Sequence, residues 1–318
     1  MTIYVYEGEK GGHYLKILKL RQKPRILRGL QYLDKRLELD HDNKRMLSNL
    51  EKGLLGESLF DEYISHFIYS EVLVLNDLLL VNKGTTFQID SLMITLDTIY
   101  VFEIKNYSSS FVMSDGEFQS ISGQTYQNPL IQLAKVKRNL ESLLSEWGIH
   151  IPIEANIIFI NSTFFLYEAK LEDPMIQPGQ IELFLTSINK KARNLEKRHH
   201  YLARKLVEAH NTGAIIQKAL PNYHYNHFKK GLTCLNCGSF NLELTQRSCY
   251  CNSCLNKNLL KEVILDHIYE YQFLFPEHKL TVTNIKDWCG SDISINSIRT
   301  VLNQHFKLIG YSRDAHYE

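Results

Sequence analysis

Two carboxylates and a lysine fall on two strand-like runs that a short turn at residues 96–98 separates. A hairpin centred on this turn places Asp90 opposite the stretch from Glu103 to Lys105. Because side chains alternate along a strand, Glu103 and Lys105 share one face. Paired carboxylates beside an ammonium are suited to bind Mg²⁺ or Mn²⁺ and to assist the attack of water on a phosphodiester. A salt-bridged surface hairpin is the alternative reading of the same residues.

A second group of residues has the spacing of metal ligands. The pair Cys234 and Cys237 and the pair Cys251 and Cys254 each form a CxxC motif, with 13 residues between the two motifs. Four thiolates at this spacing predict a structural zinc site, which supplies folding free energy to a segment too short to hold a core. Three other residues remain alternative ligands: Cys249, which could replace Cys251, and the more remote His224 and His227.

The composition limits the class of protein. The chain has 318 residues, 44% of them apolar and 22% charged, so it can bury a core and is long enough for two or three domains. Its 36 Lys and Arg against 35 Asp and Glu exclude a uniformly basic nucleic-acid coat. The chain shows no apolar run of about 18 residues and no basic, apolar leader, which predicts a cytoplasmic protein with no membrane partner. Five of the six cysteines cluster, as in a reducing compartment.

Positive charge is concentrated in two stretches of the chain. Residues 1–56 hold 12 Lys and Arg against 7 Asp and Glu, and residues 189–230 hold 10 against 2. Solvated helix faces explain such stretches as well as a surface that contacts phosphates does. Both interpretations stay open.

The hydrophobic pattern predicts the elements that position these residues. Helices are expected at 22–39, 44–67 and 129–147, and strands at 71–81, 87–95, 98–105, 155–160 and 181–185. Gly53 and Gly56 would let the second helix approach a neighbour closely. A loop is expected between residue 106 and Pro129. The result is a mixed α/β domain.

The last 58 residues predict three helices and a small ribbon, at 263–275, 281–289, 294–305 and 308–314. This order suggests a winged helix-turn-helix, in which Asn296 and Arg299 would contact DNA. A three-helix packing or dimerisation unit fits the same pattern equally well.

Several short motifs follow one another in a fixed order: Gly56-Glu57, FQIDSL at 87–92, IYVFEIKNY at 99–107, NPLIQL at 128–133, FIN at 159–161 and FLY at 165–167. Together they resemble the NERD family, the nuclease-related domain, over about residues 20–190. The resemblance implies a restriction-endonuclease-like α/β fold with a mixed central sheet flanked by helices. It also implies a PD-(D/E)xK site that hydrolyses DNA phosphodiester bonds.

The family's catalytic residues carry over to five positions. The resemblance implies that Asp90 and Glu103 bind Mg²⁺ (or Mn²⁺) and that Lys105 positions or activates water. Glu57 would support this metal or a second one, and Gln132 would line the site. These residues make the protein a candidate Mg-dependent deoxyribonuclease.

Three further positions qualify this assignment. The proline of the PD motif is Ile89 here, and a downstream aromatic position, commonly Trp, is Phe118, which concerns packing rather than metal binding. Lys135 lies one helical turn after Gln132 and could reach a phosphate. A ribonuclease and a module that binds nucleic acid without cleaving it remain the alternatives. A protein partner and a homo-oligomer also stay open.

The sequence therefore predicts five parts: a basic helical extension at 1–44, a NERD nuclease-like domain at 45–210, a linker at 211–230, a zinc ribbon at 231–260 and a C-terminal helical or winged-helix-like domain at 261–318.

Overall fold

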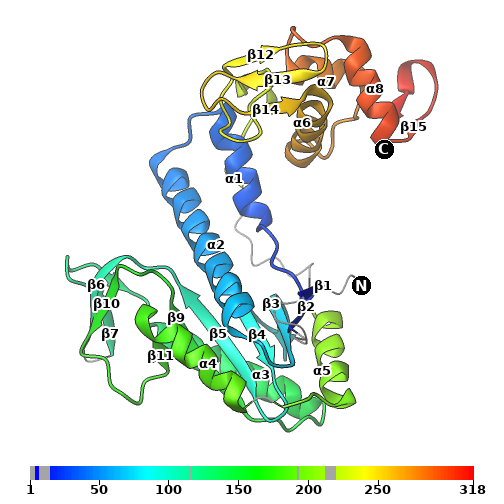
Figure 1. Ribbon diagram of the computed structural model, residues 1–318. Helices are drawn as coiled ribbons and strands as arrows, with labels where there is room; N and C mark the ends of the chain where they lie inside the picture. Colours follow the sequence, from blue (N-terminus) through cyan, green and yellow to red (C-terminus); the bar gives the residue numbers. More distant parts are fainter. Residues whose placement is uncertain (1–3, 7–14, 115, 192, 212–219) are drawn as a thin grey trace. The chain divides into compact units, whose positions relative to one another are not determined.

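The computed structural model describes residues 4–6, 15–114, 116–191, 193–211 and 220–318 (Figure 1). The chain divides into two compact units. The first comprises Met1–Lys23 and Asn49–Gln217, and the second comprises Pro24–Ser48 and Lys218–Glu318. The boundary falls within the long helix α2 (His41–Phe67). The five-part division expected from the sequence stays a prediction.

A seven-stranded mixed sheet forms the centre of the first unit. Its strands lie in the order β1 (Tyr4–Tyr6), β2 (Leu15–Lys19), β3 (Val72–Asn82), β4 (Thr85–Ile94), β5 (Ile99–Lys105), β9 (Ile153–Phe159) and β11 (Met175–Ile176). The strands β3, β4 and β5 are antiparallel neighbours, whereas β5 and β9 are parallel. The predicted mixed α/β fold is confirmed.

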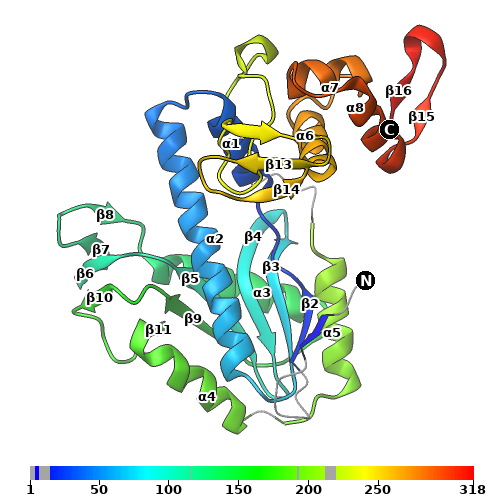
Figure 2. The ribbon, with the colours of Figure 1, turned by 45° about the horizontal axis from the view of Figure 1, so that its top comes forward.

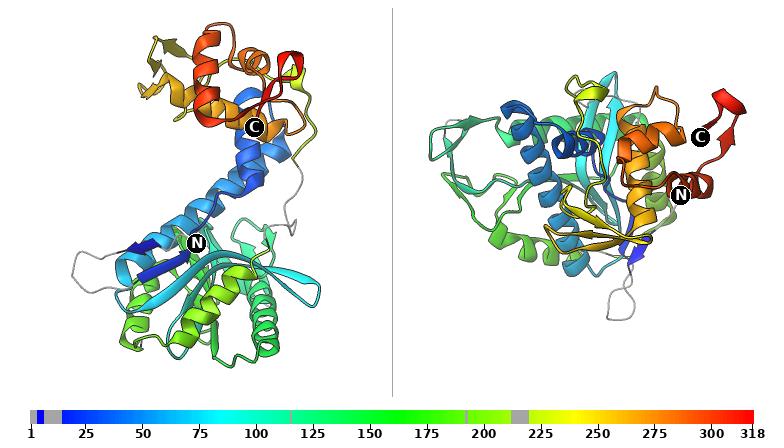
Figure 3. Two further views of the ribbon diagram at one scale, coloured as in Figure 1. Left: turned by 90° about the vertical axis from the view of Figure 1, so that its right-hand side faces the viewer. Right: turned by 90° about the horizontal axis from the view of Figure 1, so that it is seen from above.

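Helices cover both faces of this sheet (Figures 1 and 3). The apolar side chains of α3 (Pro129–Glu146) and α5 (Lys197–Glu208) pack on one face, and those of α2 and α4 (Ile181–Lys191) pack on the other. The 3₁₀ turn η1 (Pro178–Gln180) precedes α4. Alternation along β3 serves both layers, because Leu73 and Leu75 face α3 and α5 while Val72 and Val74 face α2 and α4.

A second sheet of four strands follows β5, where the sequence predicted a loop. Its order is β10 (Phe164–Tyr167), β6 (Ser109–Ser114), β7 (Glu117–Ser120) and β8 (Thr125–Tyr126). Its strands are only two to six residues long, so the local pattern gives little signal. Aromatic packing holds the sheet to the core: the Phe111 and Phe118 rings lie 4.8 Å apart and the Phe159 and Phe164 rings 4.0 Å apart. Phe118 is fully buried, in agreement with a packing role.

The strand predicted at 181–185 is wrong, because these residues begin helix α4. The buried residues Ile181, Leu185 and Ile188 are spaced four and three apart, which is helical spacing. A short apolar run does not distinguish a strand from a buried helical turn, and here the pattern continues beyond the run.

The second unit contains α1, a small sheet and a helical segment (Figure 2). The elements are α1 (Arg25–Arg36), η2 (Tyr225–His227), β12 (Leu242–Leu244), β13 (Ser248–Cys251), β14 (Lys257–Leu259), α6 (Leu260–Leu274), α7 (Val282–Cys289), α8 (Ile295–His305), β15 (Leu308–Ile309), η3 (Ser312–Asp314) and β16 (His316–Tyr317). The bridge between Leu280 and Tyr317 adds a third short strand to the β15–β16 hairpin. The elements of this segment therefore follow in the order helix, short strand, helix, helix and hairpin, which is the order of elements in a winged helix.

Part of the segment predicted as a linker packs into this unit. Residues 212–219 lie outside the described part of the chain. Beyond them, Phe228 is buried and its ring lies 5.4 Å from the Trp288 ring. Tyr225 also joins this aromatic cluster. Among the described helices of the chain, none is long and apolar enough to cross a membrane.

A buried ion pair joins α1 to α6 within the second unit. The Nε and Nη2 atoms of Arg36 donate to the two carboxylate oxygens of Glu270 at 3.0 and 2.7 Å, and both residues are almost fully buried. The guanidinium also lies 4.1 Å from the centre of the Trp288 ring and donates to the backbone oxygens of Lys229 and Gly231. The pair therefore ties α1 to the segment that precedes the cysteines.

We expect Arg36→Met to lower the free energy of unfolding of the second unit by about 3–5 kcal/mol, because Glu270 would be left buried without its charged partner, with Trp288 Nε1 as its remaining side-chain donor among the described residues. Urea unfolding in a Trp147→Phe background, followed by the fluorescence of Trp288 as the remaining tryptophan, measures this change. The double variant Arg36→Met/Glu270→Leu removes both charges and should recover most of the loss. Equal stability of Arg36→Met and the wild type would show that the pair is not needed for folding.

Candidate functional site

Asp90, Glu103 and Lys105 meet where β4 and β5 lie side by side. The backbone N–H of Ile104 donates to Asp90 Oδ2 at 2.9 Å, so the Asp90 carboxylate faces the end of β5. Lys105 Nζ donates to Glu103 Oε1 at 2.7 Å. The structure thus places these three residues where the hairpin required, while their catalytic roles stay predictions.

Helix α3 supplies the fourth member of the cluster, Gln132. Its Nε2 donates to Glu103 Oε1 at 2.6 Å, and its Oε1 accepts from Lys105 Nζ at 3.1 Å. The first turn of α3 is fixed by Pro129 and by the side chain of Asn128, which accepts from the backbone N–H of Leu130. Helix capping therefore places Gln132 over the end of β5.

The charges of the cluster oppose one another. Burial, and then the charges of Glu103 and Glu57, raise the pKa of Asp90 well above its ordinary value. Burial lowers the pKa of Lys105, but the charge of Glu103 and the hydrogen bond to it prevail, so the Lys105 pKa is raised. Lys105 is therefore an ammonium at neutral pH, whereas the raised pKa of Asp90 favours its protonated form, and a cation bound beside it would stabilise the carboxylate instead.

The donor set fits a hard divalent cation. Asp90 Oδ1 and Glu103 Oε2 have no hydrogen-bond partner among the described residues, whereas the second oxygen of each carboxylate is held in place. Mg²⁺ and Mn²⁺ take oxygen ligands of this kind and complete their shell with water. Asp90 and Glu103 could therefore hold such an ion.

An irregularity in the sheet lies next to Asp90. The pairing of β3 with β4 runs through Leu78↔Ile89 and resumes at Asn76↔Ser91, and Asp77 between them has a φ of 56°. Such an irregularity changes the direction of a side chain, as β-bulges beside active sites do. The ammonium of Lys19 donates to the backbone oxygens of Asn76 and Asp77 at 2.9 and 2.7 Å and thereby satisfies them.

Close packing brings α2 and Glu57 to the same end of β5. A Cβ atom on Gly56 would lie 2.6 Å from Cβ of Asn106, so only glycine fits this contact. Asn106 Nδ2 also donates to the backbone oxygen of Lys52 at 2.7 Å. The predicted close approach is confirmed for Gly56 but not for Gly53, which has open space around its Cα.

Arg21 pairs with Glu57, which sequence reasoning did not foresee. Arg21 Nη1 donates to Glu57 Oε2 at 2.8 Å, and its Nε and Nη2 donate to Asp61 at 3.0 and 3.1 Å. Asp61 also accepts from Asn76 Nδ2 at 3.1 Å, and Asn76 accepts from Ser91 Oγ at 2.8 Å. The spacing of Glu57 and Asp61 by one helical turn was the available signal for a shared partner, but no local pattern points to Arg21.

Comparison with known families supports the site. Residues 52–160 match the family described as the nuclease-related domain, NERD. The chain contains a nuclease-related domain. The matched stretch includes all five positions expected to be catalytic, from Glu57 to Gln132. No curated protein and no solved structure matches the chain.

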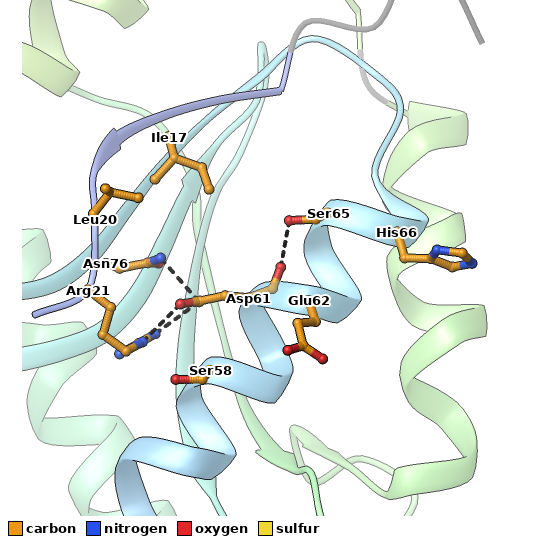
Figure 4. A pocket seen from close by; sticks show the side chains of 9 residues that line it. All are labelled: Ile17, Leu20, Arg21, Ser58, Asp61, Glu62, Ser65, His66 and Asn76. Atoms are coloured by element: carbon orange, nitrogen blue, oxygen red, sulfur yellow. Dashed lines mark hydrogen bonds and ion pairs between the residues drawn. The ribbon is translucent and has the colours of Figure 1, made fainter. Parts of the chain in front are cut away.

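A pocket of about 550 Å³ lies around Arg21 and Asp61 in the nuclease-related unit (Figure 4). The residues that line it come from β2 and the residues after it, from α2 and from β3: Ile17, Leu20, Arg21, Ser58, Asp61, Glu62, Ser65, His66 and Asn76. Figure 4 shows Arg21 and Asn76 pointing at Asp61 on its wall. None of the five expected catalytic residues lines this pocket, so we assign the chemistry to the cluster and not to the pocket.

We expect Arg21→Leu to lower the free energy of unfolding by about 2 kcal/mol, because Glu57 and Asp61 would then repel each other one turn apart. Burial already raises the pKa of both carboxyls, and Arg21 opposes that effect. Urea denaturation measures the loss. Adding Asp61→Asn to Arg21→Leu should restore part of it, and a double variant no more stable than Arg21→Leu would contradict this account.

The four cysteines of the two CxxC motifs lie together in the second unit. Their sulfur atoms are all within 4.8 Å of one another, with 3.6 Å between Cys234 and Cys254 and 3.5 Å between Cys237 and Cys251. Four sulfurs about 2.3 Å from one zinc ion would lie about 3.8 Å apart, so the geometry fits. A hydrogen bond from Asn236 and one from the Asn256 backbone lower the pKa of Cys254 to about 6, which favours its thiolate.

The alternative zinc ligands lie outside this group. Cys249 is buried on β13, and neither it nor His224 or His227 belongs to the cluster of ligand atoms. Alternation places Cys249 on the same buried face of β13 as Cys251, with the exposed Tyr250 between them, but two residues along a strand are about 6–7 Å apart, which is too far for Cys249 to share the ion that Cys251 would bind. The cysteine cluster can therefore bind a metal ion such as zinc without Cys249.

Three residues expected to contact nucleic acid are exposed. Lys135 lies on α3, one turn beyond Gln132, with its side chain in solvent. Asn296 and Arg299 lie on the exposed side of α8, opposite the buried residues Ile298 and Leu302. Their exposure permits the expected contacts, which remain predictions.

Proposed function

We propose that the nuclease-related domain is a metal-dependent nuclease that hydrolyses phosphodiester bonds of DNA. The gathering of Asp90, Glu103, Lys105 and Gln132 at the end of β5 carries this proposal. It supplies two free carboxylate oxygens for a cation and an ammonium beside them. The family match over residues 52–160 makes phosphodiester hydrolysis the reaction that best suits this group.

Asp90 and Glu103 would hold Mg²⁺ or Mn²⁺. Such an ion, when bound, offsets negative charge on the phosphate and makes water a better nucleophile. Lys105 would hold the attacking water and stabilise the charge that develops on the phosphate, since its ammonium is fixed by Glu103 and Gln132. Gln132 is the residue that keeps Lys105 and Glu103 in register with each other.

Glu57 would support the same centre through Oε1, because Arg21 holds its Oε2. Its charge also reaches Asp90, whose pKa it helps to raise after burial and Glu103. An additional negative charge at this position would strengthen the attraction of a divalent cation.

Residues outside the cluster would stabilise the fold or bind the substrate. We propose that zinc on Cys234, Cys237, Cys251 and Cys254 stabilises the small sheet, and that Lys135 contacts a phosphate near the cleaved bond. In the second unit, Asn296 and Arg299 on α8 would contact DNA, since Arg and Asn are the side chains that commonly recognise base edges.

The test is a cleavage assay with supercoiled DNA, linear DNA and an RNA of the same sequence, each with no added metal, with Mg²⁺ and with Mn²⁺. We expect nicking or degradation of DNA only when metal is added. Cleavage of RNA alone would make the protein a ribonuclease. Binding of DNA without cleavage by the folded protein under every condition would contradict the proposed reaction and favour a binding module.

A further inference from the structure

We propose that the exposed face of α5 binds the phosphate backbone of the nucleic acid, apart from the residues at the end of β5. This basic face of α5 consists of the exposed Lys197, Arg198 and Arg204 and the half-buried Lys205, with Tyr201 among them. The inference rests on the proposed function, since it assigns a second contact to the same substrate.

The geometry of α5 separates its two sides cleanly. Leu202, Ala203 and Leu206 are buried against the central sheet. Lys197, Tyr201 and Arg204 follow at intervals of four and three residues, so they form one stripe on the side away from the sheet. Lys197 and Arg204 are about 10 Å apart along the helix axis, which spans about three phosphates of one strand.

Two of the four cations of this face are not explained by pairing within the described part of the protein. Lys197 and Arg204 are exposed and have no ion-pair partner among the described residues. Arg198 pairs with Glu196 at 3.1 Å, and Lys205 Nζ lies 4.6 Å from the centre of the Trp147 ring. Glu208 is the acid at the far end of the stripe.

Helix stability does not account for Lys197 and Arg198 either, although Lys205, in the last turn, does complement the helix dipole. Lys197 and Arg198 occupy the first turn of α5, which contains no acidic residue. Cations at the start of a helix oppose its dipole and cost about 0.3–1 kcal/mol each. Three further exposed cations precede the helix: Lys190, Lys191 and Arg193. A polyanion that spans several cations is the partner that this excess of charge fits.

A nucleic acid fits the face better than an anionic membrane does. A helix that binds a membrane inserts apolar side chains, but the apolar residues of α5 are buried in the core. The exposed side offers Tyr201, 56% exposed, whose ring could stack on a base between the cations. Cations with an aromatic ring among them are the pattern of a surface that binds nucleic acid.

The test compares the full-length Lys197→Gln/Arg204→Gln variant with its parent, both in a Lys105→Ala background so that cleavage does not interfere. Binding to duplex and single-stranded DNA is measured from 0.05 to 0.3 M salt, without a chelator so that the cysteine cluster is undisturbed. We expect affinity to fall about 10- to 100-fold at 0.1 M salt. The slope of log affinity against log salt should flatten by about 1.8 for duplex or about 1.4 for single strands.

The matched control is Lys83→Gln/Lys170→Gln, which removes two exposed lysines elsewhere in the same unit. It should bind like its parent, and thermal melting should show that both double variants are folded. Equal affinity and slope in the α5 variant and its parent would overturn the inference. So would stronger binding of the parent to phosphatidylserine vesicles than to DNA. Neither result would contradict the proposed function, which fails only if the wild-type protein does not cleave nucleic acid in the presence of the metal ion.

Discussion

Lys105→Ala is expected to reduce metal-dependent cleavage of DNA by about 10²- to 10⁴-fold, the usual loss when one group that acts on the transition state is removed. The ammonium of Lys105 lies between Glu103 and Gln132, and no other described cation contacts both residues. The rate of nicking of supercoiled DNA at saturating Mg²⁺ measures the loss.

Two controls keep this result interpretable. Lys137→Ala removes an exposed lysine of α3 that pairs with Glu141, and it should cleave like the wild type. Binding of DNA by Lys105→Ala should be nearly unchanged, because the loss concerns the reacting phosphate. Full activity of Lys105→Ala would mean that another group performs the chemistry, and the site at the end of β5 would be wrong.

Cys251→Ala is expected to abolish zinc binding and to unfold the small sheet of β12, β13 and β14. A structural zinc ion contributes about 10–16 kcal/mol of binding free energy, and this segment has little apolar core of its own. Elemental analysis should find one zinc ion per chain in the wild type and none in the variant. Limited proteolysis should then cut the variant between residues 231 and 260.

Cys249→Ala is the matched control, since it removes a buried thiol two residues away that lies outside the sulfur cluster. We expect it to keep its zinc and its resistance to proteolysis. If Cys249→Ala loses zinc while Cys251→Ala keeps it, the ligand assignment is reversed. A wild-type protein that contains no zinc but folds normally would contradict the structural role altogether.

The two variants also separate the two units. Lys105→Ala should leave the zinc content unchanged, and Cys251→Ala should leave the nuclease-related unit folded, because the cysteines and the β5 cluster belong to different units. Thermal unfolding of Cys251→Ala should therefore retain a transition from the first unit.

Much of the site follows from patterns that are local in the chain. The short turn between β4 and β5 fixes which residues pair, as the Ser91↔Phe102 register shows. The CxxC spacing fixes the cysteine cluster in the same way. Helix capping at Asn128 and Pro129 fixes where α3 begins. Each of these features depends on residues within about twenty positions of one another, so the sequence carries the signal.

Other features depend on residues that only the fold brings together. Arg21 reaches Glu57 and Asp61 from a position 36 and 40 residues away, and no periodicity links them. The irregular pairing at Asp77 breaks the alternation of β4, since Ile89 and Leu92 face the same core although they are three residues apart. The usual alternation of side chains along a strand does not predict such a shift, because the shift arises from the way in which β3 pairs with β4.

The sequence alone therefore determined the chemistry: two carboxylates, a lysine and four thiolates with the spacing that their elements require. The tertiary structure decided the surroundings of these groups. It placed Arg21 on Glu57 and folded the expected loop after β5 into a sheet. Charge pairing and the burial of aromatic rings between distant segments govern these outcomes, and neither leaves a pattern within a short stretch of chain.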